Sequence, residues 1–175
     1  HLSSLIDGYA GIIRKSDQKT ENIIHVIDNA LFNTEYRLKA HDIEVERQYK
    51  NFSGTKKVKI SRSLFVGAIM NIIDNSIYWL EQSKCEHKKF YVGITEDDKF
   101  LNIIFADNGV GFLLPTDTVT EPFVSAKPDG IGLGLHIANE ILVAQKGTLK
   151  FPEFDDVSIP LDYKNGAIIV FCLKK

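Results

Sequence analysis

Residues 125–142, SAKPDGIGLGLHIANEIL, place Gly130, Gly132 and Gly134 in alternation with apolar residues, directly before a helical pattern. A glycine inside a helix costs roughly 1 kcal/mol relative to alanine, so three of them at a helix start need an explanation. A glycine-rich turn leading into a helix presents unpaired N–H groups and the positive end of the helix dipole to an anion. Lys127 adds a positive charge three residues before Gly130. The stretch therefore indicates a site for phosphate groups.

Two familiar phosphate-binding motifs do not fit this stretch. The sequence has no G-x-x-x-x-G-K-[S/T], which excludes a P-loop. The glycines follow a loop instead of a strand, and they read G-x-G-x-G instead of G-x-G-x-x-G, which argues against a dinucleotide-binding fold. The fold must therefore be inferred from the elements on either side.

Hydrophobic spacing outlines these elements. Apolar residues three and four apart predict helices over 2–14, 21–40, 62–83 and 131–146. Apolar runs and alternations predict strands over 43–49, 57–60, 90–96, 100–106, 148–152 and 167–173. The segment 107–130 reads as a loop, and loops of this length in compact domains are usually functional or mobile. This mixture predicts an α/β two-layer sandwich, with one sheet and helices packed on one face.

Composition bounds the class of protein. A chain of 175 residues with 44% hydrophobic residues fits one compact domain. A net charge of −2 gives no general attraction to nucleic acid or to an anionic membrane. Cys85 and Cys172 are too few for a disulfide framework and lack metal-ligand spacing, which favours a reducing compartment. Without a membrane-length apolar run or a signal peptide pattern, we expect a soluble, cytoplasmic fragment of a longer protein, with no membrane contact.

The expected helix 62–83 carries an unusual polar stripe. Asn71, Asp74, Asn75 and Tyr78 fall at i, i+3, i+4 and i+7 and so share one face. An ordinary solvent-facing stripe would be rich in lysine, glutamate and arginine. Amide oxygens suit Mg²⁺, which takes the rest of its ligands from waters and substrate phosphates. The alternative is a polar helix face without a ligand.

The segment 105–112, FADNGVGF, ends an apolar strand in Asp-Asn-Gly. Asn-Gly is a common hairpin signal, so an ordinary turn is one interpretation. The residues that follow do not read as a return strand, which weakens that interpretation. Ionised Asp107 only accepts hydrogen bonds and suits a ligand amine, while nearby glycines would let a flat ring approach. Both interpretations stay open from these residues alone.

In combination, these motifs resemble those of the GHKL ATPases. Residues 71–75 (NIIDN) resemble the N box, and 107–111 (DNGVG) and 130–135 (GIGLGL) resemble the two glycine boxes. Residues 121–130 (EPFVSAKPDG) are similar to the F box and phosphate-facing lysine of sensor histidine kinases. The resemblance implies the Bergerat-type sandwich, with a mixed, mostly antiparallel sheet. It also implies that 1–20 end a preceding dimerisation-type helix with its linker, and that 21–175 form the ATP-binding catalytic domain.

The resemblance implies ATP and Mg²⁺ as ligands and assigns roles to individual residues. Asn75 would ligate Mg²⁺, with Asn71 beside the metal and phosphates, and Asp107 would accept from the adenine amino group. Loop 113–129 would be the ATP lid, with Phe123 as its hydrophobic anchor and Lys127 reaching the phosphates. The remaining nucleotide contacts would come from Trp79, Gly109 and Gly111 near the base, and from Gly130, Gly132, Leu133, Gly134 and Leu135 around the phosphates.

The residue at position 71 distinguishes between members of this superfamily. Hydrolysing members resembling gyrase carry a glutamate at the position of Asn71, where it deprotonates the attacking water, and an amide cannot take that proton. This favours a histidine kinase that moves the γ-phosphoryl group by positioning and charge neutralisation, with Asn71 and Lys127 as catalytic residues. His1 lacks the neighbours of a phosphoacceptor. We therefore expect the acceptor in a histidine-bearing dimerisation domain outside this fragment, within a homodimeric parent that serves a response regulator.

Two alternatives to a kinase stay open, and three departures from the kinase pattern bear on the second of them. Tyr78 and Trp79 stand where many kinases have a lysine and then a tyrosine, and Ala167 stands where a threonine is frequent. One alternative is an ATPase switch of the gyrase or chaperone type, in which nucleotide closes a dimer. The other is a nucleotide-binding scaffold derived from kinases that has no transfer activity.

Overall fold

Five strands form one mixed sheet in the order β2-β4-β5-β7-β6. The computed structural model describes residues 2–175, so His1, considered above as a phosphoacceptor, lies outside the described residues. The strands are β2 (Glu44–Arg47), β4 (Lys89–Glu96), β5 (Phe100–Asp107), β6 (Thr148–Lys150) and β7 (Ile168–Lys174). Only β2 and β4 pair in parallel, and the other neighbours are antiparallel. The expected mixed, mostly antiparallel sheet is confirmed.

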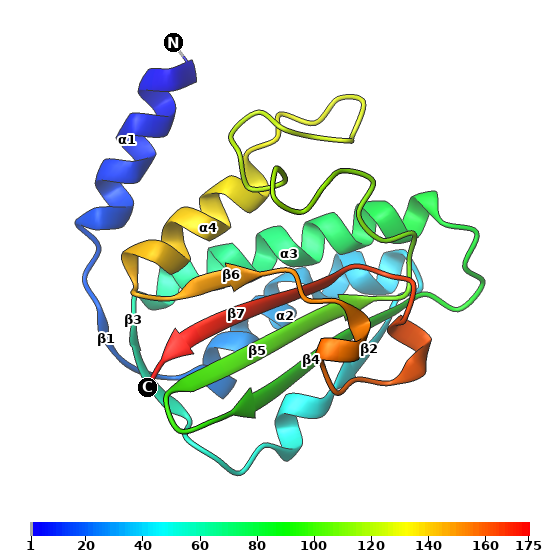
Figure 1. Cartoon of the computed structure of the whole chain (residues 1–175), viewed down its shortest axis with the longest axis horizontal. Coiled ribbons are helices and arrows are strands. Elements are labelled where there is room, and N and C mark those ends of the chain that lie inside the picture. The colour runs from blue at the N-terminus through cyan, green and yellow to red at the C-terminus, as the bar shows by residue number, and fades with distance from the viewer. Residues whose placement is uncertain (1) are drawn as a thin grey trace.

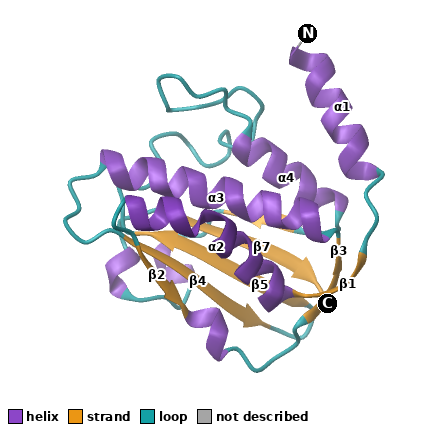
Figure 2. Ribbon diagram, turned by 180° about the vertical axis from the view of Figure 1, so that it is seen from behind, coloured by secondary structure: helices purple, strands orange, loops and turns teal. Residues whose placement is uncertain are grey.

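Three helices cover one face of this sheet: α2 (Ile23–Ala40), α3 (Arg62–Gln82) and α4 (Gly134–Ala144) (Figure 1, Figure 2). Their apolar faces meet the sheet in a core that contains an aromatic cluster. Phe171 of β7 packs edge-on against Phe65 of α3 and Phe105 of β5, with ring centroids 5.6 Å and 4.9 Å apart. Such pairs contribute about 0.5–1.5 kcal/mol each beyond the burial of their surface. The two-layer sandwich is therefore the observed architecture.

Helix α3 is the central helix of the domain. By length and composition it is the one helix of residues 2–175 that could cross a membrane, and half of its most apolar window is buried inside the domain. Phe65, Ile69 and Ile72 on its apolar face are fully buried. These contacts explain its hydrophobicity by packing against the sheet.

Strand β1 (Lys19–Asn22) was not expected from the sequence. It pairs antiparallel with β3 (Lys57–Ile60) in a separate two-stranded sheet. Its sequence, KTEN, has no hydrophobic pattern, so its pairing with β3 alone defines it. Before it, α1 (Leu2–Arg14) extends from the sandwich and contacts α4 (Figure 1).

The outer face of the sheet is partly covered by the segment between β6 and β7. This segment contains the short 3₁₀ helices η2 (Phe154–Asp156) and η3 (Leu161–Tyr163). Fully buried Tyr163 packs on Tyr91 of β4, with ring centroids 5.4 Å apart, and its hydroxyl donates to Glu46. A further 3₁₀ helix, η1 (Gln48–Asn51), follows β2, which is why the strand expected over 43–49 ends at Arg47.

Candidate functional site

A cavity of about 360 Å³ lies between α3, the end of β5, the loop 113–129 and the start of α4. Its size is within the usual range for a ligand pocket. Most of the residues selected from the sequence line it: Asn71, Asn75, Trp79, Asp107, Gly111, Lys127, Gly130, Gly132, Leu133, Gly134 and Leu135. Gly109 and Phe123 do not. The fold therefore brings segments far apart in the sequence to one cavity.

Asp107, at the end of β5, is the buried acid of this cavity, with only 2% of its surface exposed. One carboxylate oxygen accepts from the backbone N–H groups of Gly109 (3.0 Å) and Ala167 (3.3 Å). The other accepts from the hydroxyl of Ser76 on α3, at 2.9 Å. Burial raises the pKa of Asp107, and these three hydrogen bonds oppose that rise. The carboxylate is thus fixed in place with no cation at hydrogen-bonding distance among the described residues.

Two glycines allow the backbone to close around this carboxylate. A Cβ on Gly166 would lie 1.6 Å from the carbonyl oxygen of Asp107, so the segment just before β7 can approach only as bare backbone. Gly109 was expected to make room for a ring. Its N–H instead donates to the Asp107 side chain, and a Cβ there would lie 3.1 Å from the carboxylate. Gly109 therefore positions the acid without lining the cavity.

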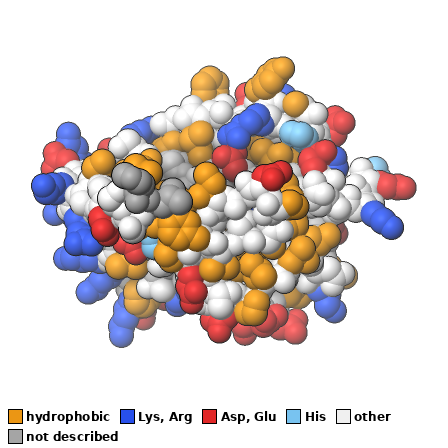
Figure 3. Space-filling model, turned by 90° about the horizontal axis from the view of Figure 1, so that it is seen from above, with side chains coloured by type: hydrophobic (Ala, Val, Ile, Leu, Met, Phe, Trp, Pro, Cys, Tyr) orange, Lys and Arg blue, Asp and Glu red, His pale blue; other side chains and the backbone are white. Residues whose placement is uncertain are grey.

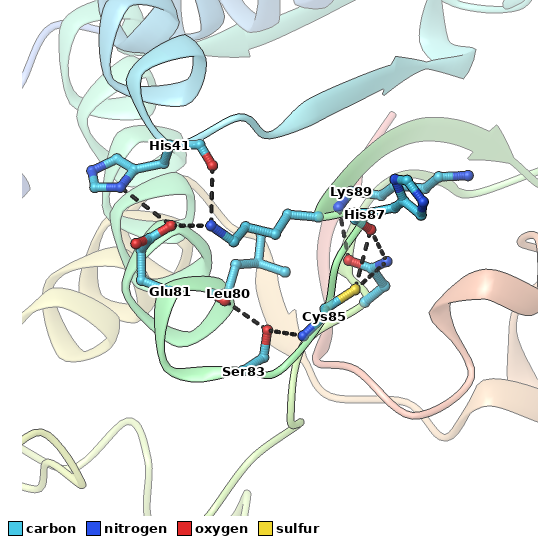
Figure 4. A network of polar contacts seen from close by, with 9 residues as sticks. His41, Leu80, Glu81, Ser83, Cys85, His87 and Lys89 are labelled. Atoms are coloured by element: carbon cyan, nitrogen blue, oxygen red, sulfur yellow. Dashed lines mark hydrogen bonds and ion pairs between the residues drawn. The ribbon is translucent and has the colours of Figure 1, made fainter.

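Asn108 ties the end of β5 to the loop between α3 and β4. Its side-chain oxygen accepts from the backbone N–H of Lys89 at 2.7 Å, and its amide donates to the carbonyl of His87 at 2.7 Å and to the sulfur of Cys85 at 3.3 Å. Figure 4 shows Cys85, His87 and Lys89 close together at one end of a network of polar contacts, with Glu81 and His41 at the other end. The residue after Asp107 is therefore held from several directions.

At the other end of the cavity, α3 and α4 meet through Asn71. The Asn71 amide donates to the carbonyl of Gly134 at 3.2 Å. Gly132 has φ +76°, so the helix expected from residue 131 begins only at Gly134. A Cβ on Gly132 would lie 2.6 Å from the backbone of Phe123 and Val124. The bare backbone at Gly132 therefore faces the lid backbone, whereas the sequence interpretation had placed phosphate against all three glycines.

Phe123 does not anchor the lid by its ring, contrary to expectation. The residue has φ +67°, its side chain is 46% exposed, and its N–H donates to the carbonyl of Gly132 at 3.0 Å. Its backbone, held in the left-handed conformation, makes this lid contact. Val119 is the buried apolar residue of the lid, at 8% exposure, and the ring of His136 on α4 lies 3.0 Å from the carbonyl of Thr120.

Figure 3 views the molecule from above the lid and shows apolar side chains reaching the surface at several points among polar ones. The exposed apolar residues of the lid and the adjoining turn are Leu113, Phe123 and Ile131. The lid therefore combines a buried contact with an exposed apolar surface.

Lys127 extends from the lid into the cavity and meets α3. Its ammonium donates to the side-chain oxygen of Asn75 at 2.6 Å and lies 4.8 Å from the centre of the Tyr78 ring. Burial lowers the pKa of Lys127, and the charge of Asp74 opposes that shift. Asp74 itself is paired with Arg37 of α2. Asn75 and Lys127, chosen separately from the sequence, are in direct contact.

The described residues contain no group of three or more His, Cys, Asp or Glu side chains that could hold a metal ion. The cavity offers the amides of Asn71 and Asn75 instead. Such a set fits Mg²⁺ that arrives with phosphate oxygens and waters, because this ion commonly keeps several waters and takes few protein ligands. It does not fit a metal held by protein side chains alone.

Comparisons with known proteins show which proteins this chain is similar to. No family model matches the chain. Sensor protein TdiS of Thauera aromatica is 26% identical over 138 residues, which are 77% of this chain and 25% of that protein. The chain thus spans about a quarter of the length of this curated relative.

Solved structures extend the likeness to the whole fold. The histidine kinase AdeS of Acinetobacter baumannii superposes with a TM-score of 0.71 at 19% identity, over 99% of this chain and 78% of that one. The catalytic domain of histidine kinase ThkA gives 0.68 at 17% identity, over 91% of this chain and 98% of that one. The chain has the fold of a histidine kinase catalytic domain. Full-length ShkA in complex with AMPPNP gives 0.69 at 18% identity, over 91% of this chain and 31% of that one.

Two side chains of this catalytic-domain fold were missed by sequence reasoning. Ser76 was not selected on the expected helix 62–83, and Val119 was included only as part of the loop 107–130. A hydroxyl within a buried row is a signal in itself, because a buried polar group needs a hydrogen-bond partner. For Val119 the sequence held no comparable signal, since single apolar residues occur in many loops.

Proposed function

We propose that residues 21–175 are the ATP-binding catalytic domain of a sensor histidine kinase, which binds ATP with Mg²⁺ and donates its γ-phosphoryl group to a histidine outside this chain. One observation carries this proposal. A buried carboxylate, Asp107, lies in a cavity whose other end combines a glycine-rich helix start with a lid lysine. The ShkA complex with AMPPNP and the sensor protein TdiS support it by likeness.

At the base end, Asp107 would accept from the adenine amino group. Its Oδ1 already accepts two backbone N–H groups, and its Oδ2 accepts the Ser76 hydroxyl, which leaves acceptor capacity on Oδ2. Trp79 lines the cavity and would contact the base. A guanine would place a carbonyl oxygen where adenine has its amino group, so a fixed acceptor favours adenine.

At the phosphate end, the N–H groups before α4 and the Lys127 ammonium would neutralise the phosphate oxygens. Mg²⁺, when bound, would supply further charge neutralisation, with Asn75 as its ligand and Asn71 beside it. Asn71 already donates to Gly134, and an amide cannot remove a proton from water. These residues would therefore position the γ-phosphoryl group for transfer instead of hydrolysing it.

The remaining assignments concern the longer protein. Residues 1–20 would be the end of a dimerisation-type helix and its linker, although Lys19 and Thr20 already lie in β1. The parent would be a cytoplasm-facing homodimer, with the acceptor histidine in its dimerisation domain and a response regulator as its partner. Leu5, Tyr9 and Ile12 of α1 are exposed, which suits a helix that continues into such a domain.

Calorimetric titration with ADP and ATP, with and without Mg²⁺, tests nucleotide binding directly. We expect micromolar binding that Mg²⁺ strengthens and that Asp107→Asn abolishes. Trp79 is the only tryptophan in the chain and lines the cavity, so its fluorescence gives a second readout. No binding by the intact chain would refute the proposal.

Transfer needs a separate experiment. The chain is mixed with γ-labelled ATP and a separately produced, histidine-bearing dimerisation domain, and label on the histidine is measured. Label on that domain, absent with Asn71→Ala, supports a kinase. Steady phosphate release without label on the acceptor would favour an ATPase switch, and intact binding with neither activity would favour a scaffold.

A further inference from the structure

The Lys127 ammonium is held on α3 by two groups of different character. Asn75 offers a side-chain oxygen at 2.6 Å, and Tyr78, three residues later on the same helix face, offers its ring at 4.8 Å. Lys127 and Tyr78 are both partly buried. Asp74, the acidic residue on this face, is engaged by Arg37. The lid cation is therefore held by an amide oxygen and an aromatic face.

These two contacts respond differently to a metal ion. Under the proposed function, the Asn75 oxygen would ligate Mg²⁺, and the Lys127 ammonium would then leave that oxygen because two cations cannot share it closely. The ring of Tyr78 is no ligand for Mg²⁺, since this ion prefers oxygen donors. A ring face attracts an ammonium through its quadrupole without consuming its hydrogen-bond donors. The Tyr78 contact can thus persist while Lys127 donates to phosphate.

We propose that Tyr78 is a positioning residue, which holds the Lys127 ammonium at the edge of the cavity and keeps the lid ordered over the phosphate site. The inference rests on the proposed function for its effect on ATP, whereas its effect on the lid does not depend on nucleotide. Tyr78 also packs edge-on against Trp79, with ring centroids 4.8 Å apart. A test must therefore separate the route through Lys127 from a route through Trp79.

The test combines Tyr78→Leu, Tyr78→Phe, Lys127→Met and the double variant Tyr78→Leu/Lys127→Met. Hydrogen exchange of the lid amides 113–129 is measured without nucleotide, and ATP affinity is measured with Mg²⁺. Loss of a cation–π contact predicts, for Tyr78→Leu, exchange about fivefold faster and binding about fivefold weaker. Tyr78→Phe keeps the ring and should match the wild type in both. In the Lys127→Met background, Tyr78→Leu should have no further effect.

Each contrary outcome overturns the inference. A Tyr78→Leu effect that persists in full beside Lys127→Met would show that Tyr78 acts through Trp79 or through packing. A Tyr78→Phe variant as impaired as Tyr78→Leu would assign the effect to the hydroxyl, and unchanged lid exchange in Tyr78→Leu would remove the positioning role. A wild type that fails to bind ATP would refute the proposed function, while lid exchange would still decide the role of Tyr78.

Discussion

Asp107→Asn should stabilise the fold while it removes nucleotide binding. The carboxylate is buried with three hydrogen-bond donors and no neighbouring cation among the described residues. An asparagine can keep all three contacts. Its oxygen accepts from Gly109 and Ala167, and its amide donates to the Ser76 hydroxyl, which can also accept. The substitution therefore removes a buried charge without leaving a buried group unpaired.

The size of the effect follows from two opposing energies. Burying an ionised carboxylate costs about 4–5 kcal/mol after relaxation. Hydrogen bonds to a charged acceptor are stronger than those to a neutral one by about 1 kcal/mol each, so three such bonds offset roughly 3 kcal/mol. Asp107→Asn should therefore raise the free energy of unfolding by about 1–2 kcal/mol. In a domain of this size that is about 2–8 °C in Tm.

The stability gained by Asp107→Asn must depend on pH, and the direction of that dependence follows from the pKa of Asp107. Burial raises the pKa of Asp107 above its ordinary value of 3.8, so the ionised form is the one that the folded state disfavours. The penalty is present above the folded-state pKa and disappears as pH falls towards 3.8, where the unfolded chain also becomes protonated. The difference in Tm between Asp107→Asn and the wild type should thus be largest near pH 8 and vanish near pH 4.

Thermal unfolding of both proteins across pH 4–8, without nucleotide, measures this difference. Asp107→Glu serves as the control, because it keeps the charge while the added methylene moves the carboxylate off its three donors, and it should lower Tm. A less stable Asp107→Asn at pH 8, or a gain that grows towards acid pH, would refute the reasoning. Either result would mean that a favourable interaction of the charge outweighs its burial.

Other substitutions test the close backbone contacts at Gly132 and Gly166 and the hydrogen bond from the Ser76 hydroxyl. Gly132→Ala places a Cβ 2.6 Å from the lid backbone at a residue with φ +76°. It should lower the free energy of unfolding by at least about 2 kcal/mol and speed hydrogen exchange in the lid. The control is Gly67→Ala on α3, where nothing lies within 4 Å of the added Cβ, and it should be neutral or stabilising by up to about 1 kcal/mol. Gly166→Ala, 1.6 Å from the Asp107 carbonyl, should cost more than about 3 kcal/mol in denaturant unfolding. Ser76→Ala removes a donor from buried Asp107 and should cost about 1–3 kcal/mol and weaken ADP binding, measured by calorimetry.

Much of the fold was predictable because its core elements carry their own hydrophobic pattern. Apolar residues three and four apart predicted α3, and the apolar runs in β4, β5 and β7 predicted strands. Strand β1 was not predictable, since KTEN has no pattern and gains its structure from β3. The start of α4 was misplaced because Gly132 takes its positive φ in contact with the lid, a tertiary effect that local spacing does not contain.

The candidate site was predictable where residue type alone limits the role. An aspartate at the end of an apolar strand and an amide stripe on a core helix both line the cavity, and their chemical roles remain predictions. Phe123 was wrongly assigned as an anchor because aromatic residues usually bury their rings, whereas here the left-handed backbone at this residue leaves the ring exposed. Side-chain direction in a loop depends on backbone angles that the sequence does not specify.

The departures from the kinase pattern are best judged by what surrounds them. Ala167 lacks a hydroxyl near the acid, yet Ser76 supplies one to Asp107 from the opposite side, on α3. Tyr78 lacks the charge of a lysine, yet the Lys127 ammonium lies against its ring. In both places a polar group from another element lies beside the altered position, at a spacing that the sequence alone does not reveal. Because the Ser76 contact also stabilises buried Asp107 without a ligand, these polar contacts alone do not separate a nucleotide site from a scaffold, and the calorimetric titration decides between them.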